Sequence, residues 1–224
     1  MDASGPQAKS DTQRQPIRLL VFSASLRRES YNTRLALLAG RIMARNGGTV
    51  DQAMMSDFAC PPYDADVQQR DGLPPASEEF RRRIEANDAF VIASPEYNAS
   101  MPGHLKNTID WTSRAQPQPF NERHGLLLSA SPSMVGGNRG LWALRVSLEH
   151  LGARVYPDMY SLAQAHRAFS VDGGIADQDL GQRLEHVLQG FLDLVEATKH
   201  YACARKAWFE FLGERPDALT ERSE

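Results

Sequence analysis

The chain has 224 residues, of which 42% are apolar and 24% are charged, and its formal net charge is -3. This length is enough for one good-sized hydrophobic core, and the composition is that of an ordinary globular protein. The nearly balanced charge gives no sign of a nucleic-acid or acidic-membrane partner. No apolar run is long enough to cross a bilayer, so we expect neither kind of partner.

The chain begins with the polar stretch MDASGPQAKSDTQRQP, which contains no hydrophobic segment. We therefore predict a disordered tail over residues 1–16 and no secretory signal. The two cysteines, Cys60 and Cys203, stand in no metal-binding or redox spacing, which indicates a reducing, cytoplasmic location. The six histidines have no metal-ligand spacing either, so we predict no metal site.

The first half of the chain alternates short apolar runs with stretches of helical periodicity. Apolar residues between Leu35 and Met43 recur at intervals of three and four, which predicts a helix that Gly47 ends. The expected elements are, in order, a strand at 17–22, this helix, a weaker strand at 50–55, a proline-bearing loop at 58–76, a helix at 77–87 and a buried strand at 89–93.

The second half of the chain continues the same alternation. Leucines 141, 144, 148 and 151 line one face of a helix that Gly152 closes. The expected elements are a helix after Pro102, a strand at 126–129, the leucine-lined helix, a short strand at 154–156 and a long helix at about 178–212. An apolar cluster near the end of that helix is expected to pack on the core or on a partner chain; it comprises Trp208, Phe209, Phe211 and Leu212.

Strand and helix alternate five times, which predicts an α/β fold with a parallel sheet and helices on both of its faces. Five strands favour the strand order 2-1-3-4-5 over a six-stranded dinucleotide-binding sheet. Ligands of such sheets bind beyond the carboxyl ends of the strands, where strands 1 and 3 diverge. We therefore expect the functional site in three loops, at residues 23–32, 94–103 and 130–140.

The first loop lies in the segment FSASLRRESYN, at the start of the predicted first helix. Several groups here are suited to binding a phosphate. They are the helix N-terminus, the hydroxyls of Ser23, Ser25 and Ser30, the Arg27 guanidinium and the Asn32 amide. Because the loop has no glycine, it lacks both the dinucleotide fingerprint and the P-loop pattern, and it favours a terminal phosphate monoester. The alternative is that Ser30 simply caps the helix.

The second loop opens the segment SPEYNASMPGHLKNTIDW, residues 94–111. The backbone N–H groups of Glu96, Tyr97 and Asn98 have no evident secondary-structure partner and are expected to meet the polar edge of a flat heterocycle. Tyr97 offers a ring, and Asn98 offers a donor and an acceptor. Ser100 is a candidate helix cap. The alternative is an ordinary turn between strand and helix.

The segments ASLRRESYN and PEYNASMPGHLKNTIDW together resemble the NADPH-dependent FMN reductase family of flavodoxin-like proteins, which includes quinone, chromate and azo-dye reductases. The similarity extends over most of residues 17–195, including GGNRGLWALRVSLEHLGARVYP. It implies a flavodoxin-like three-layer sandwich as one reductase domain at 17–204, followed by a C-terminal extension at 205–224. Ala24 departs from the family, which often has glycine there.

The resemblance also implies a set of ligand-binding residues. The first loop is expected to hold the FMN phosphate, and its residues are Ser23, Ser25, Arg27, Ser30, Tyr31 and Asn32. The second loop is expected to border the isoalloxazine ring through Pro95, Glu96, Tyr97 and Asn98. In the third loop, SASPSMVGGNRG, Ser131 and Gly136 are expected to approach the ring. Arg139 is a candidate for the 2′-phosphate of NADPH, or else an ordinary surface arginine.

As the resemblance implies, NADPH reduces bound FMN, which then reduces a small-molecule acceptor: a quinone, free flavin, azo compound or metal oxyanion. No side chain has to act as acid or base, so no catalytic residue is predicted. A homodimer or homotetramer is expected. One alternative is an FMN-binding electron carrier without efficient NADPH turnover, which the weak net charge disfavours. Another is a nucleotide-binding enzyme without flavin, which the absence of glycine in the first loop disfavours.

Overall fold

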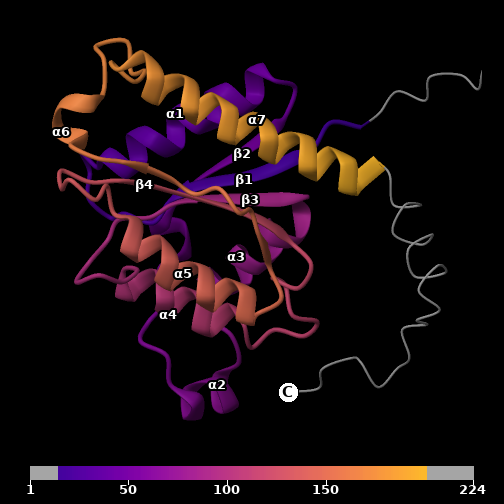
Figure 1. Cartoon of the computed structure of the whole chain (residues 1–224). Coiled ribbons are helices and arrows are strands. Elements are labelled where there is room, and N and C mark those ends of the chain that lie inside the picture. Colours follow the sequence, from indigo (N-terminus) through magenta and orange to yellow (C-terminus); the bar gives the residue numbers. More distant parts are fainter. Residues whose placement is uncertain (1–14, 201–224) are drawn as a thin grey trace, which may run out of the picture.

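The computed structural model describes residues 15–200 (Figure 1). Most of the predicted N-terminal tail, Cys203, the apolar cluster at 208–212 and the C-terminal extension lie outside these residues. The elements in chain order are β1 (Arg18–Ser23), α1 (Tyr31–Arg45), β2 (Thr49–Met54), the 3-10 helix η1 (Met55–Phe58), α2 (Ala65–Asp71), α3 (Pro75–Ala86), β3 (Ala89–Ala93), α4 (Gly103–Thr112), β4 (His124–Ala130), α5 (Asn138–His150), β5 (Arg154–Val155), β6 (Tyr160–Leu162), α6 (Ala165–Ala168) and α7 (Gln178–His200).

The strands form one parallel sheet in the order β2-β1-β3-β4-β5, which confirms the predicted order. The fifth position is divided, because β5 pairs with the start of β4 and β6 pairs with its end. The predicted strand at 154–156 is therefore shorter, and β6 was not predicted. Two features separate β5 from β6. The Arg145 guanidinium donates hydrogen bonds to the carbonyls of Val155 and Tyr156, and Pro157 has no N–H to donate.

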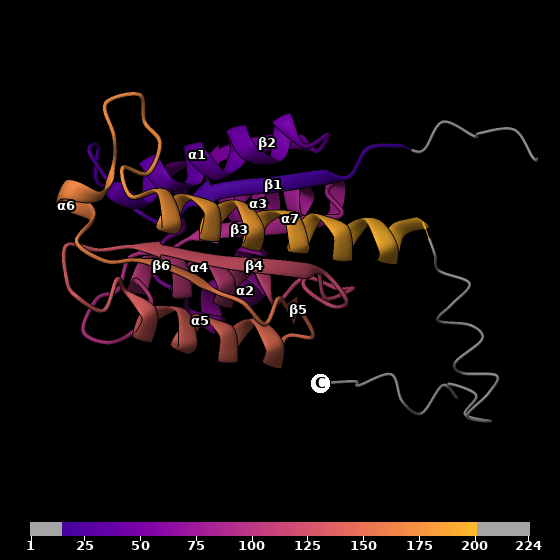
Figure 2. The same cartoon turned by 45° about the horizontal axis from the view of Figure 1, so that its top comes forward.

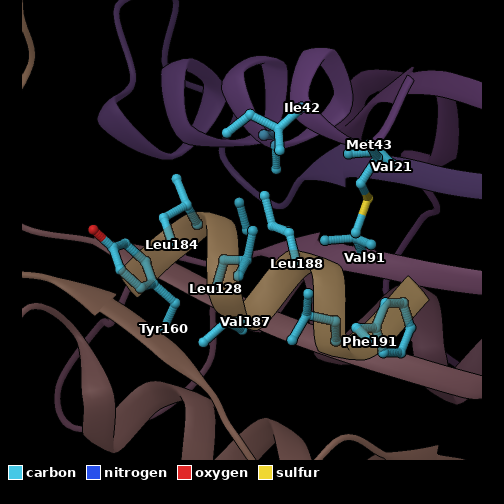
Figure 3. Packing of buried hydrophobic residues seen from close by; sticks show 14 of the residues in the cluster. Val21, Ile42, Met43, Val91, Leu128, Tyr160, Leu184, Val187, Leu188 and Phe191 are labelled. Carbon is cyan, nitrogen blue, oxygen red and sulfur yellow. The ribbon is translucent and has the colours of Figure 1, made fainter. Parts of the chain in front are cut away.

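Helices cover both faces of the sheet, as Figures 1 and 2 show. On one face, α1 and α7 pack over the side chains of Val21, Val91 and Leu128, which are all fully buried. Figure 3 shows Leu188 and Phe191 of α7 in this layer. The neighbouring strand residues point to the opposite face, where they meet η1, α3, α4 and α5. Because the strands are buried on both faces of the sheet, their sequences are almost continuously apolar.

Two local predictions were wrong. The segment predicted as a loop at 58–76 contains the short helix α2, whose N-terminus is capped by the Asp64 carboxylate through the N–H groups of Asp66 and Val67. No residue of α2 is buried, and the helix therefore lacks the row of apolar residues by which a helix is recognised in the sequence. Ser100 does not cap α4; that helix begins at Gly103 after Pro102.

His124, the first residue of β4, is a buried titratable group that the sequence did not single out. It is 7% exposed, and neither ring nitrogen has a hydrogen-bond partner among the described residues. Burial, together with the nearby Arg154 guanidinium, lowers the pKa of His124 below its ordinary value. The native chain therefore holds this imidazole neutral under the last turns of α7.

The stability of the protein is expected to fall as the pH drops below about 6.5, where an unfolded histidine takes up a proton and the native His124 does not. Since the unfolded state then binds more protons, the free energy of unfolding decreases with decreasing pH. Urea unfolding at pH 7.5 and pH 5.5 measures this. The His124→Leu variant should show a smaller pH dependence; an equal dependence in both proteins would refute the assignment.

Candidate functional site

The carboxyl ends of β1, β3 and β4 lead into the three loops predicted to form the site. Where β1 ends, the N–H of Ala24 donates to the carbonyl of Ala93 at 2.9 Å. The Ala24 carbonyl lies 2.8 Å from Nε2 of His104 in α4, and because a carbonyl only accepts, Nε2 carries the proton. The first loop is thus tied to both sides of the second.

The three serines of the first loop shape it from inside. Ser23 Oγ accepts from the N–H of Ser25, and Ser25 Oγ accepts from the N–H of Arg27. Ser30 Oγ accepts from the N–H groups of residues 32 and 33, so Ser30 caps α1. All three serines are 5% exposed or less. Cap and phosphate site are compatible, because a hydroxyl that accepts still has a hydrogen to donate.

Asn32 joins the first loop to the third. Its Nδ2 donates to the carbonyl of Ala130 at 2.9 Å, and its Oδ1 accepts from the N–H of Ala130 at the same distance. Asn32 is 3% exposed. The sequence predicted this amide as a phosphate donor; one of its two N–H bonds points to the last residue of β4, and the other has no partner among the described residues. Its observed role is to fix the start of α1 against the sheet.

Three groups around the start of α1 fit a phosphate. The Arg27 side chain is exposed and makes no hydrogen bond or ion pair with the described residues. The N–H of Tyr31, the first residue of the helix, also has no partner there. Thr33 Oγ1 is buried without a partner in the described chain. Sequence reasoning missed Thr33, although a hydroxyl in the first helical turn beside a phosphate loop is a usable signal.

The second loop forms a tight turn. Tyr97 and Ser100 exchange backbone hydrogen bonds of 2.9 and 3.0 Å, and Asn98 and Ala99 between them have φ of 51° and 61°. The N–H of Tyr97 is therefore paired, against the prediction. The N–H groups of Glu96 and Asn98 have no partner among the described residues, as predicted. The turn leaves the Tyr97 side chain exposed.

Pro95 and Glu96 lead into this turn and are partly buried. The Glu96 carboxylate turns toward α5, where Oε2 accepts from the N–H of Arg139 at 3.0 Å and of Gly140 at 3.2 Å. The Arg139 guanidinium binds Oε1 of the same carboxylate. Burial opposes the charge, but the bonds from Arg139 and Gly140 outweigh it and lower the pKa of Glu96. Arg139 is thus an ion-pair partner of the second loop.

The third loop lies against β6. Ser131 is partly buried, and its Oγ bonds with the N–H and hydroxyl of Ser133. Gly136 is buried with φ of 65°, and a Cβ there would lie 2.9 Å from the N of Ala163. Gly137 also leaves no room for a side chain, because a Cβ at this position would lie against Ser129 Oγ. The two glycines therefore let the third loop lie close to the end of β6 and to the Ser129 side chain.

Two hollows lie away from these loops. One, of about 460 Å³, opens between α1 and α7, and the other, of about 340 Å³, surrounds the amino end of β4. Both contain charged side chains that pair with each other, Arg45 with Glu185 and Lys199 with Asp88. The groups of the first loop that have no partner among the described residues, which are the Arg27 guanidinium, the N–H of Tyr31 and Thr33 Oγ1, lie instead beyond the carboxyl ends of the strands. Within the described residues, no helix is long and apolar enough to cross a membrane.

Residues 17–167 match the family described as NADPH-dependent FMN reductase. The chain belongs to this family. A relative from Pseudomonas aeruginosa, named as an NAD(P)H-dependent FMN reductase, is 37% identical over 175 residues, which are 77% of this chain and 92% of the relative. The quinone reductase of Escherichia coli K12 is 32% identical over 185 residues, covering 82% of this chain and 97% of that protein. The resemblance predicted from the sequence is confirmed.

Solved structures of the same shape agree with this family. FerB of Paracoccus denitrificans, titled a flavoenzyme NAD(P)H:(acceptor) oxidoreductase, has a TM-score of 0.70 at 26% identity. The match covers 80% of this chain and 97% of FerB. An archaeal flavodoxin has a TM-score of 0.53 at 9% identity, which shows the fold alone. The reductase has the flavodoxin-like fold that the sequence predicted.

Replacing Asn32 with alanine is expected to destabilise the reductase by about 2–4 kcal/mol, because both backbone groups of Ala130 lose a buried partner. The measurement is urea unfolding followed by circular dichroism. Asn46→Ala is the matched control: Asn46 ends the same helix and makes one side-chain bond to its backbone. It should cost clearly less, and equal losses in both variants would contradict the role given to Asn32.

Proposed function

We propose that this reductase binds FMN at the three loops and uses NADPH to reduce a quinone or a similar small acceptor. The observation that carries the proposal is the first loop, where a capped helix start, an unpaired Arg27 and an unpartnered Thr33 hydroxyl converge without any glycine. This arrangement suits a terminal phosphate, which FMN has and a dinucleotide lacks at that position. We further propose residues 17–204 as the single reductase domain.

The chain itself would bind and orient the cofactor. The phosphate would be held by Arg27, by the N–H of Tyr31 and by the hydroxyls of Ser25, Ser30 and Thr33. Ser23 and Asn32 would shape the loop behind these groups. When bound there, FMN would supply the hydride-accepting and electron-donating chemistry that links NADPH to the acceptor.

The unpaired N–H groups of Glu96 and Asn98 would meet the polar edge of the ring, and Tyr97 and Pro95 would flank it. Ser131 and Gly136 would border the ring from the third loop. Arg139 is paired with Glu96, so we assign no NADPH phosphate to it.

We propose a homodimer that includes the face of α5. Trp142 and Val146 lie one helical turn apart on α5 and are 54% and 68% exposed. Met134 and Val135, in the third loop, are also exposed apolar side chains. Such a concentration of apolar side chains is typical of a protein interface. Analytical ultracentrifugation of the full chain tests this, and sedimentation as a monomer would contradict it.

The purified protein is expected to be yellow, or to turn yellow with added FMN, and anaerobic NADPH should bleach it rapidly. Absorbance near the flavin band in a stopped-flow instrument measures both. Bleaching by dithionite but not by NADPH would support an electron carrier in place of the reductase. A protein that stays colourless and binds no FMN would overturn the proposal.

The Arg27→Ala variant is expected to bind FMN about 10- to 150-fold more weakly, since a hydrogen bond to a charged group contributes about 1.5–3 kcal/mol. Quenching of FMN fluorescence on titration with the apoprotein measures the dissociation constant. Arg28→Ala is the control, because Arg28 is the next residue and is also exposed. Equal affinity in wild type and Arg27→Ala would place the phosphate elsewhere.

A further inference from the structure

Helix α5 has no N-terminal cap within its own segment. Its N-cap residue is Gly137, which has no side chain and a φ of 86°. The carboxylate of Glu96, from the second loop, takes over this role by accepting from two N–H groups of the first turn. Two further contacts from the Arg139 guanidinium give this carboxylate four donor contacts.

The position of this carboxylate is closely constrained. The Glu96 side chain is 9% exposed, although Arg139 beside it is 61% exposed. The backbones also touch: a Cβ on Gly140 would lie 3.0 Å from the carbonyl oxygen of Ser100 and 3.1 Å from Cα of Glu96. The second loop and the start of α5 therefore meet with no room for a side chain between them, and the carboxylate has a fixed place.

Three charges meet at this contact. The start of a helix carries a positive partial charge of roughly half an elementary charge, and Arg139 adds a full one. The ionised Glu96 compensates most of this positive charge. Because the unpaired N–H groups expected at the ring edge belong to Glu96 itself and to Asn98, the balance of charge here acts on whatever the second loop binds.

We propose that the Glu96 carboxylate is a positioning residue that also sets the reduction potential of the flavin, by cancelling the positive field of Arg139 and of the α5 N-terminus. This inference rests on the proposed function, which places FMN on the second loop. A flavin gains negative charge when it is reduced to the anionic form, so a positive field raises its potential and a negative one lowers it.

The proposal predicts opposite effects for the two members of the pair. Glu96→Gln keeps the size and one acceptor but leaves Arg139 and the helix terminus uncompensated, so the potential should rise. Arg139→Gln leaves the Glu96 charge in excess, so the potential should fall. Arg139→Lys keeps the charge and should stay near wild type. The double variant Glu96→Gln/Arg139→Gln should lie between the two single variants.

The experiment is an anaerobic potential titration of the FMN-loaded protein against reference dyes, with FMN affinity and thermal unfolding measured on the same samples. We expect each single variant to change the ratio of affinities for the two redox forms about tenfold, which equals about 30 mV for a two-electron couple. Glu185→Gln is the control, because Glu185 forms an exposed ion pair with Arg45 between α1 and α7. It should leave the potential unchanged.

Shifts of the same sign in Glu96→Gln and Arg139→Gln, or no shift in either, would overturn the inference. If Glu96→Gln fails to fold, the exposed Arg139→Gln and Arg139→Lys variants still decide it, because only the charge-removing one should lower the potential. A wild-type protein that binds no FMN would instead overturn the proposed function, so the two failures are distinguishable.

Discussion

The site depends on how the backbone groups at the ends of parallel strands find hydrogen-bond partners once the sheet stops, since unpaired buried N–H and C=O groups are costly. Ala24 bonds to Ala93 and to His104, and Asn32 takes both backbone groups of Ala130. Each of these bonds joins two different loops. The contacts that terminate the sheet therefore also fix the relative positions of the three loops.

The charged groups of these loops divide into paired and unpaired ones. Glu96 and Arg139 neutralise each other at the start of α5, whereas Arg27 at the start of α1 has no partner among the described residues. The start of α5 is thus closed by a carboxylate from the second loop, whereas the start of α1, capped by Ser30, keeps the N–H of Tyr31 unpaired among the described residues. This asymmetry gives a physical reason to place the phosphate on the first loop and the ring, which carries no fixed charge when oxidised, near the second.

Much of the fold followed from local patterns. The strand order was predicted correctly from the alternation of apolar runs and helical patterns. The cap at Ser30, considered as the alternative to a phosphate role, is present, because a serine before a helix is a local signal. The pairing of the Tyr97 N–H with Ser100 was missed, because it needs left-handed backbone at Asn98 and Ala99, two residues of which only asparagine favours it. The division of the fifth strand was missed for a similar reason, since the Arg145 side chain that interrupts it comes from a helix.

By itself, the sequence determined the alternation of strands and helices, the edge of the sheet at which ligands are expected, and the residue types available there. Only the tertiary structure decided which of those residues remain available. The Asn32 amide and the Glu96 carboxylate form hydrogen bonds with distant parts of the chain. The Arg27 guanidinium and the Thr33 hydroxyl have no partner among the described residues. The physical reason is that a polar side chain at such an edge competes for partners more than 40 residues away, and sequence spacing carries no information about which partner it reaches.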